Sequence, residues 1–163
     1  MRNAFATGLI AALLLLSAQD RARAAPFDYF SGNWECTSDA ASKSFLLYHP
    51  VLGRQWLVLE NTFINPPSTT IGEFIEYYRY DQQERKWWAT SMGSNGLLEV
   101  SMSGDWKNDQ LVFEGSANFP GGSFKSREIY TRWKDGSLER EHDQQTQFGW
   151  SKYSHSLCRR ARP

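Results

Sequence analysis

The stretch Gly32-Asn33-Trp34-Glu35-Cys36 places a tryptophan two residues before one of the two cysteines of this 163-residue chain. The other cysteine lies almost at the end, in Ser156-Leu157-Cys158-Arg159-Arg160. If the two stretches form neighbouring antiparallel strands with the cysteines opposite each other, the rest of the register is fixed. It then also sets Trp34 opposite Arg160, Glu35 opposite Arg159 and Asp39 opposite His155. We therefore predict that the last strand returns beside the first and closes a barrel.

The two cysteines are expected to form a disulfide, Cys36–Cys158. Two cysteines far apart in a chain, without C-x-x-C or zinc-type spacing, most simply form one bridge in an oxidising compartment. In the chain-entropy model, a disulfide that closes a loop of this length stabilises the fold by about 4–5 kcal/mol, because it restricts the unfolded chain. Two free buried thiols are the alternative.

Residues 1–24 have the features of a cleaved secretory signal peptide. Arg2 precedes an apolar run, Phe5 to Leu16, and the small-x-small sequence Ala22-Arg23-Ala24 follows it. The run is shorter than the roughly 20 apolar residues of a membrane span. We predict cleavage after Ala24, a single mature domain over residues 25–163, and a periplasmic or secreted location. A buried N-terminal helix is the alternative.

Composition limits the function classes. The chain carries 18 basic and 18 acidic residues, and no basic stripe that would favour nucleic acid is visible. It has seven tryptophans, seven tyrosines and ten phenylalanines, which is more than a small core needs. We expect some of these aromatic side chains to line a cavity.

Turn signals recur at roughly ten-residue intervals between short runs rich in aromatic and β-branched residues, a spacing typical of all-β sandwiches and barrels. Gly93-Ser94-Asn95-Gly96 is the clearest hairpin turn, and Asn118 to Ser123 is expected to be a flexible loop. The predicted fold is all-β: a closed antiparallel up-and-down barrel of about nine or ten strands, favoured over a sandwich because the two termini pair and closure removes exposed edges.

The sequence Gly32-Asn33-Trp34 resembles the Gly-x-Trp signature of lipocalins and their calycin relatives. In those families the tryptophan lies at the barrel base beneath an arginine of the last strand, so the resemblance implies that Trp34 and Arg160 (or Arg159) form that base. The order of features is also similar to an uncharacterised family of exported bacterial lipocalin-like barrels. Those features include Val51–Leu57 and Tyr78–Asp81.

The nitrobindin haem barrels are similar as well. That resemblance would make His155 the haem ligand, but the glycine-rich continuation of the family's first motif is missing after Trp34. We expect no cofactor, and haem bound by His155 is the alternative.

Several side chains are candidates for ligand contacts: Tyr78, Trp88, Tyr130 and Arg132. Glu128, Tyr130 and Arg132 share one strand face. They are either outward ladder partners or, if they face inward, Tyr130 and Arg132 form a clamp for a carboxylate. The carboxylates of Glu139 to Asp143 alternate along a strand and are expected on a solvated outer face, so no metal site is predicted. No catalytic residue is identified.

The favoured function is binding of a small apolar or aromatic molecule inside an exported barrel. A small barrel enzyme with isomerase- or lyase-type acid–base chemistry is one alternative. A structural or partner-binding domain with a filled interior is another. The ligand and the oligomeric state stay open, and neither nucleic acid nor a membrane span is expected.

Overall fold

The computed structural model describes residues 25–39, 42–64 and 71–162. The chain divides into two compact units, Met1–Phe30 and Ser31–Pro163. The described part of the first unit holds one short helix, α2 (Ala25–Asp28). The expected signal peptide, residues 1–24, lies outside the described residues, so that prediction is untested. None of the helices in the described ranges has the length and apolar character needed to cross a bilayer.

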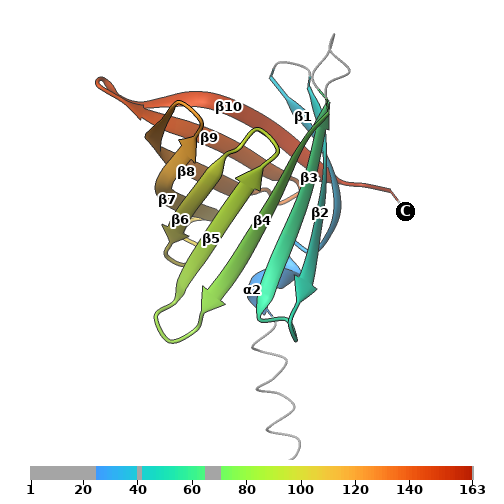
Figure 1. The fold of residues 1–163 in the computed structure, drawn as a ribbon. Helices are drawn as coiled ribbons and strands as arrows, with labels where there is room; N and C mark the ends of the chain where they lie inside the picture. The colour runs from blue at the N-terminus through green and yellow to red at the C-terminus, as the bar shows by residue number, and fades with distance from the viewer. Residues whose placement is uncertain (1–24, 40–41, 65–70, 163) are drawn as a thin grey trace, which may run out of the picture. The chain divides into compact units, whose positions relative to one another are not determined.

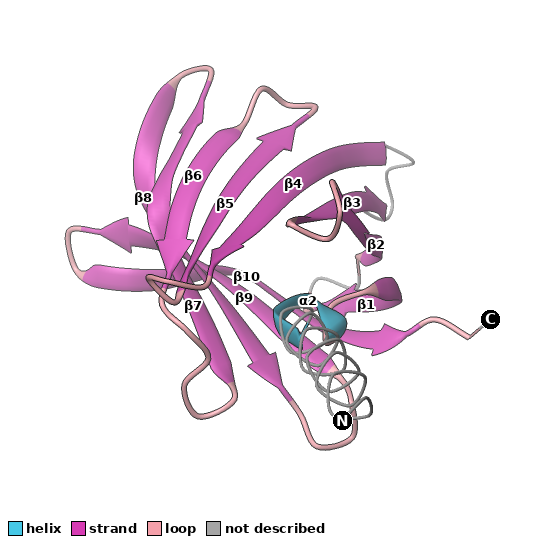
Figure 2. Cartoon of the chain, turned by 90° about the horizontal axis from the view of Figure 1, so that it is seen from below, coloured by secondary structure: helices cyan, strands magenta, loops and turns pink. Residues whose placement is uncertain are grey.

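The second unit is a closed antiparallel barrel of ten strands, in which every strand pairs with its neighbours in the chain and β1 pairs with β10 (Figures 1 and 2). This confirms the predicted fold class. The strands are β1 (Gly32–Ser38), β2 (Lys43–Val51), β3 (Trp56–Ile64), β4 (Ile71–Asp81), β5 (Lys86–Gly93), β6 (Leu98–Ser103), β7 (Gln110–Phe119), β8 (Gly122–Arg132), β9 (Leu138–Thr146) and β10 (Gly149–Arg160).

The closing pair of strands has the register predicted from the cysteines. Trp34 lies opposite Arg160, Glu35 opposite Arg159 and Cys36 opposite Cys158. The cysteines form a disulfide, and the Arg160 guanidinium lies 4.1 Å from the centroid of the Trp34 ring. The backbone N–H of Asp39 donates to the carbonyl of His155 at 3.3 Å, which continues the same register. Because β1 pairs with β10 along the ladder, the barrel has no free edge, and the disulfide adds a covalent link between the same two strands.

The turns explain how short sequence signals fix the hairpins. Gly96 has a φ of +83°, which a glycine adopts without strain, and its N–H donates to the carbonyl of Gly93 at 3.0 Å. The expected flexible loop from Asn118 to Ser123 is wrong: β7 continues to Phe119, β8 begins at Gly122, and these two residues pair across a tight turn. The glycines and the proline there build a turn, and the flanking residues join the ladder.

The barrel interior has two halves along the barrel axis, and they differ in how fully inward-facing side chains fill them. Near the turns that follow β2 and β4, the interior is filled by bulky side chains such as Trp34, Trp87 and Phe113, all with at most 1% exposure. We call this half the packed half. Phe113 makes edge-on ring contacts with Tyr78, Trp87 and Tyr130 at centroid distances of 5.6, 6.4 and 6.0 Å. The other half, where β1 ends and β2 begins, holds a cavity.

Candidate ligand cavity

The cavity has a volume of about 710 Å³, within the range of sites that enclose a small organic molecule. Inward-facing side chains of the barrel strands line it. Four of the lining residues are aromatic: Phe63, Phe74, Phe124 and Tyr153. Seven are serines: Ser38, Ser42, Ser44, Ser91, Ser126, Ser154 and Ser156. The walls therefore offer both apolar area and hydroxyl groups, and are more polar than the aromatic composition suggested.

Phe63 and Phe74 form one apolar wall of the cavity. Their rings stack with centroids 5.5 Å apart. A side chain on either of two glycines would collide with these rings: Gly72 with Phe63, and Gly93 with Phe74. The two glycines therefore leave the space that the stacked rings occupy, and Phe63 lies directly across the β3–β4 pair from Gly72.

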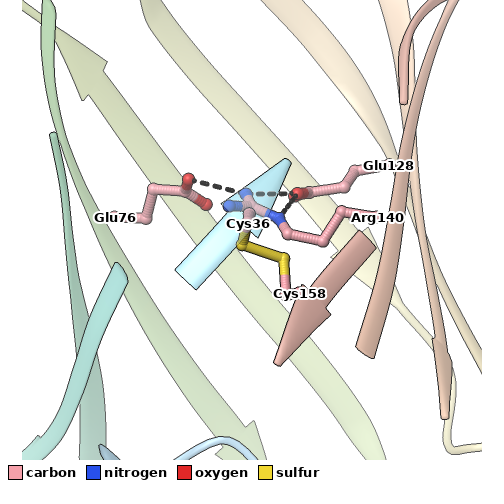
Figure 3. The surroundings of a disulfide bond; sticks show 5 residues. All are labelled: Cys36, Glu76, Glu128, Arg140 and Cys158. Atoms are coloured by element: carbon pink, nitrogen blue, oxygen red, sulfur yellow. Dashed lines mark hydrogen bonds and ion pairs between the residues drawn. A yellow bond between two sulfur atoms is a disulfide. The ribbon is translucent and has the colours of Figure 1, made fainter. Parts of the chain in front are cut away.

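A buried charged network forms the floor of the cavity, at the border with the packed half. Arg140 extends from β9 between two carboxylates (Figure 3). Its Nε and Nη2 donate to Glu128 Oε1 at 3.1 and 2.6 Å, and Nη2 also donates to Glu76 Oε1 at 3.2 Å. All three side chains are buried. One guanidinium thus holds two carboxylates from β4 and β8 in place, a geometry that its planar donor set favours.

The two floor carboxylates have opposite pKa shifts. Burial raises the pKa of Glu76, and the nearby Glu128 charge adds to this, while Arg140 acts against it. For Glu128, burial also favours the neutral form, but His142 and Arg140 together hold its pKa well below the usual range. The floor therefore keeps Glu128 ionised and leaves Glu76 as the carboxylate that protonates more readily.

Three tyrosines connect the floor to the packed half. The Tyr78 hydroxyl donates to Glu76 Oε2, and it lies 2.6 Å from the Tyr130 hydroxyl. The rings of Tyr48 and Tyr78 lie 6.4 Å apart. Burial raises the pKa of all three phenols, so they stay protonated and act as hydrogen-bond donors and acceptors.

His142 extends from β9 into the cavity above the floor. Its Nε2 lies 2.6 Å from Glu128 Oε1, and its ring stacks on Tyr153 with a centroid distance of 6.2 Å. Burial works against the charged imidazole, but the Glu128 carboxylate outweighs burial and raises the pKa of His142. Tyr153 lies at the register shift between Lys152 and Ser154 in β10, where the irregularity lets consecutive residues line the cavity.

Glu99 is a further cavity carboxylate, on β6. It accepts a hydrogen bond from the Ser126 hydroxyl at 2.6 Å. Burial raises its pKa, which marks a carboxylate in a partly desolvated position. On β3, the side-chain oxygen of Asn61 is buried and accepts no hydrogen bond from any described residue.

The four sequence-predicted ligand residues fall into two groups. Tyr78 and Tyr130 face inward and are joined through their hydroxyls beneath the cavity floor. Trp88 faces outward and is 42% exposed. Arg132 ion-pairs with Asp109 at 3.0 Å and lies over the Trp106 ring, away from Tyr130's hydroxyl partners. The structure therefore brings together only the two tyrosines.

The strand face shared by Glu128 and Tyr130 points inward, since Glu128 is 8% and Tyr130 0% exposed. The alternative that these residues are outward ladder partners is therefore wrong. The arginine beside Tyr130 is Arg140, its cross-strand neighbour, with its guanidinium 5.3 Å from the ring centroid. That arginine is already bound by two carboxylates.

Sequence reasoning missed Glu76, Glu99, Arg140 and His142 as cavity residues. Each alternates with outward-facing neighbours in its strand, and on β4 Glu76 lies between Phe74 and Tyr78 on the same face. A charged residue in phase with aromatic ones was the available signal. On β9, the predicted outer face is partly right: Glu139 and Glu141 are only half-buried, while Asp143 is buried and bound by Arg127 at 2.5 Å.

The contacts of His155 do not fit its predicted role as a haem ligand. Its Nδ1 lies 2.8 Å from Asp39 Oδ1 and its Nε2 lies 2.8 Å from Glu139 Oε1, so both ring nitrogens are bound to carboxylates. These two hydrogen bonds raise the pKa of His155. No nitrogen is left for iron, and we derive no haem chemistry here. Over the described ranges no group of three or more acidic, histidine or cysteine side chains is arranged to hold a metal ion.

Comparisons with known proteins give no match: no protein-family model matches the chain, and no curated protein matches it in sequence. The closed ten-strand barrel is consistent with a lipocalin-like fold.

Proposed function

We propose that this chain is an exported β-barrel that binds a small organic molecule with an apolar or aromatic body. The observation that carries the proposal is the cavity of about 710 Å³, with aromatic and hydroxyl walls above a buried charged floor. Barrels of this size enclose one ligand when side chains leave the interior unfilled. A domain with a filled interior is less consistent with this cavity.

Export is part of the proposal. The Cys36–Cys158 disulfide favours an oxidising compartment outside the cytoplasm. The charged, apolar and small-residue order of residues 1–24 supports secretion with cleavage after Ala24. The mature mass of the purified protein, with two hydrogens missing for the disulfide, tests both points.

Ligand binding is tested by native mass spectrometry of the protein purified from a bacterial periplasm. The expected result is a co-purifying mass that leaves after mild denaturation. The variant Ala117→Phe should lose it, because Ala117 is buried and lines the cavity. Val112→Phe, a half-buried position on the outer face of the same strand, is the matched control. Equal loading of the two variants would count against the cavity as the binding site.

One observation favours an acid–base enzyme as a second candidate. His142 faces the cavity with Nε2 bound by the Glu128 carboxylate, the arrangement of a histidine oriented by a third group. The Glu128 carboxylate raises the pKa of His142, which favours the protonated imidazole that a proton donor needs. If chromatography and mass spectrometry show that the co-purifying molecule is converted to a product or an isomer by the protein, and not by His142→Gln, the enzyme is favoured over the binding protein.

A further inference from the structure

We infer that the ligand of the cavity carries a positively charged amine beside its apolar or aromatic body, and that Glu99 is the carboxylate that binds the amine. This inference rests on the proposed function and names the chemistry of its ligand. It follows from which charged groups of the cavity are already paired and which are not.

Apart from Lys43, the basic residues that line the cavity are held by carboxylates of the protein. Arg140 donates hydrogen bonds from Nε and Nη2 to Glu128 and Glu76. The remaining pairs are His142 with Glu128, Arg127 with Asp143, Lys152 with Glu141, and His155 with Asp39 and Glu139. An anionic ligand would have to compete with these carboxylates for their basic partners, which is unfavourable where a carboxylate is left unpaired in a partly buried position.

Lys43 is the exception, and it lies at the rim. It is exposed and occupies the first position of β2, out of phase with the inward residues Leu46 and Tyr48. It lines the cavity from this rim, where its side chain is exposed to solvent.

Glu99 is in the opposite situation. Over the described ranges it has no ion pair, and its one side-chain hydrogen bond comes from the neutral Ser126 hydroxyl. A carboxylate in a partly desolvated site gains most from an opposite charge. An ammonium group placed against Glu99 would supply that charge and the missing donors.

Other hydrogen-bond acceptors lie in the same part of the cavity as Glu99. In one row across the sheet, Ser91 lies between Glu76 on β4 and Glu99 on β6. The spacing of strands sets the backbones of the two glutamates about 10 Å apart. Asn61, which also lines the cavity, holds a buried side-chain oxygen that accepts nothing from the described residues. Glu99 and Asn61 thus offer acceptors that no charged donor of the described residues fills.

The aromatic walls suit the same ligand. Phe124 lies two strands from Glu99 in the same row, opposite Ala117, and Phe63 and Phe74 stack on the β3–β4 side. Aromatic faces pack against an apolar body and attract a cation placed over the ring. Tyr153 also lies near, since the Glu99 and Glu128 charges add to burial in raising its pKa.

Three probes that share a phenyl ring and differ in charge test the inference: 2-phenylethylamine, 2-phenylethanol and 3-phenylpropionate. Binding is measured by titration calorimetry at about pH 8, where carboxylates are ionised and alkylamines are protonated. We expect the amine to bind at least about tenfold more tightly than the alcohol, and the propionate more weakly than either.

The variant Glu99→Gln keeps the size of the side chain and an acceptor for Ser126, and it removes the charge. It should cut the affinity for the amine about tenfold or more and leave that for the alcohol within about twofold. Glu35→Gln, an exposed glutamate on the outer face of β1, is the matched control and should change neither.

Other outcomes separate this inference from the proposed function. Equal affinity for amine and alcohol, or an amine preference that survives Glu99→Gln, would refute the amine site and leave the cavity as a binding site. If the propionate binds most tightly, the ligand carries a negative charge and the amine inference is refuted. If none of the probes binds and the purified protein carries no ligand, both proposals fail.

Amine affinity should also fall in acid, because protonation of Glu99 removes the charge that binds the ammonium. Burial raises the pKa of Glu99, so the loss begins at a higher pH than for an exposed glutamate. The titratable groups that face this carboxylate across the cavity are Glu76 on β4, Glu128 on β8, His142 on β9 and Tyr153 on β10. In Glu99→Gln the residual affinity should lose this acid dependence, and an unchanged dependence would assign it to His142 or Glu76.

A different feature, the outer face of β4, β5 and β6, carries a second inference. These strands lie side by side on one flank of the barrel (Figure 1). Seven large apolar side chains face outward there, each between 36% and 50% exposed: Ile75, Tyr77, Trp88, Met92, Leu98, Val100 and Met102. Cross-strand pairs such as Trp88–Met102, Met92–Leu98 and Ile75–Met92 make this apolar flank continuous.

We propose that the apolar flank binds a second copy of this chain. With about 200 Å² for a large side chain, the seven residues expose roughly 600 Å². That equals the largest patch of a typical monomer and approaches the roughly 800 Å² that each partner buries in a stable complex. Elsewhere on the barrel, exposed apolar residues stand beside polar ones, as Phe45 does between Glu35 and Thr62.

Charges at the two ends of one row favour a copy of the same chain as the occupant. The row reads Arg79, Trp88, Met102, Glu114 across four strands. If two copies pack face to face about a two-fold axis parallel to the strands, Arg79 of each copy faces Glu114 of the other. A membrane surface would instead favour basic residues on both sides.

Sedimentation velocity over a range of protein concentrations tests this interface. We expect a monomer–dimer equilibrium that Val100→Lys weakens at least about tenfold, while Phe45→Lys, equally exposed on β2, does not. Arg79→Glu and Glu114→Arg should each weaken the dimer, and the double variant should restore it. A protein that stays monomeric at every concentration would refute the proposal, and failure of the double variant would refute the two-fold arrangement.

Discussion

The substitution Arg140→Met should remove the positive charge that compensates two buried carboxylates, Glu76 and Glu128. Arg140 is 6% exposed and binds Glu128 and Glu76 through three hydrogen bonds. Breaking a buried pair by deleting one partner typically costs about 3–5 kcal/mol, because the other charge stays buried without compensation. Methionine fills a similar volume without a charge, so the loss would come from electrostatics and not from a cavity.

The size of the loss should depend on pH in a defined direction. In the wild type, the low pKa of Glu128 stabilises the fold above the pKa of the unfolded chain, and this contribution disappears as pH falls through the folded value. The raised pKa of Glu76 acts in the opposite direction. Without Arg140 both carboxylates should protonate at higher pH. The deficit of Arg140→Met should therefore be largest at neutral pH and shrink as the carboxylates become neutral in mild acid.

Urea denaturation followed by tryptophan fluorescence, at a series of pH values, measures this deficit as a shift of the midpoint at constant slope. Arg159→Met on the outer surface of β10 is the control and should change stability by less than about 0.5 kcal/mol. If Arg140→Met is too unstable to purify, Arg140→Met with Glu76→Gln and Glu128→Gln should recover most of the loss. A deficit below about 1 kcal/mol, or one that is independent of pH, would refute the assigned role of Arg140.

Three further predictions concern the closing strands. Trp34→Ala should destabilise the barrel by about 3–5 kcal/mol in urea denaturation, since Trp34 is fully buried under Arg160; a fully stable variant would contradict its role at the barrel base. Cys36→Ser with Cys158→Ser should lose about 4–5 kcal/mol, and the wild type under reducing conditions should show the same loss. Asp39 and Glu139 raise the pKa of His155, so the extra stability of wild type over His155→Gln should be present below the unfolded pKa and vanish as pH rises through the folded pKa. A stability difference that grows with pH would show that the imidazolium is not the stabilising form.

The closure of the barrel could be predicted because it depends on a few residues with strict geometry. One assumed contact, Cys36 with Cys158, fixed every other pair between β1 and β10, and those pairs also matched in charge and in cation–π contact. Turn residues marked the hairpins for a similar reason, since a positive φ at Gly96 needs a glycine.

The cavity floor could not be predicted in the same way. Alternation along β8 and β9 shows which residues share a face, but it does not show which face is inward when both carry charges. Arg140 and His142 lie on one face of β9 and Glu139 and Glu141 on the other, and both faces read as solvated. Only the contact of Arg140 with Glu76, 64 residues away in the chain, shows that the charged face is internal. Such a pairing has no local signal.

The position of the Arg140 network separates stability from recognition in this barrel. Below it, the packed half is filled by aromatic rings that need no ligand. Above it, the serine and aromatic walls are left open. A floor whose donors and acceptors are mutually bound holds its shape when the cavity is empty, so a ligand would meet a preformed site. Glu99 stands outside this network, with only Ser126 as partner. Loss of Arg140 should therefore appear first in folding, whereas Glu99→Gln should change binding and leave stability nearly unchanged.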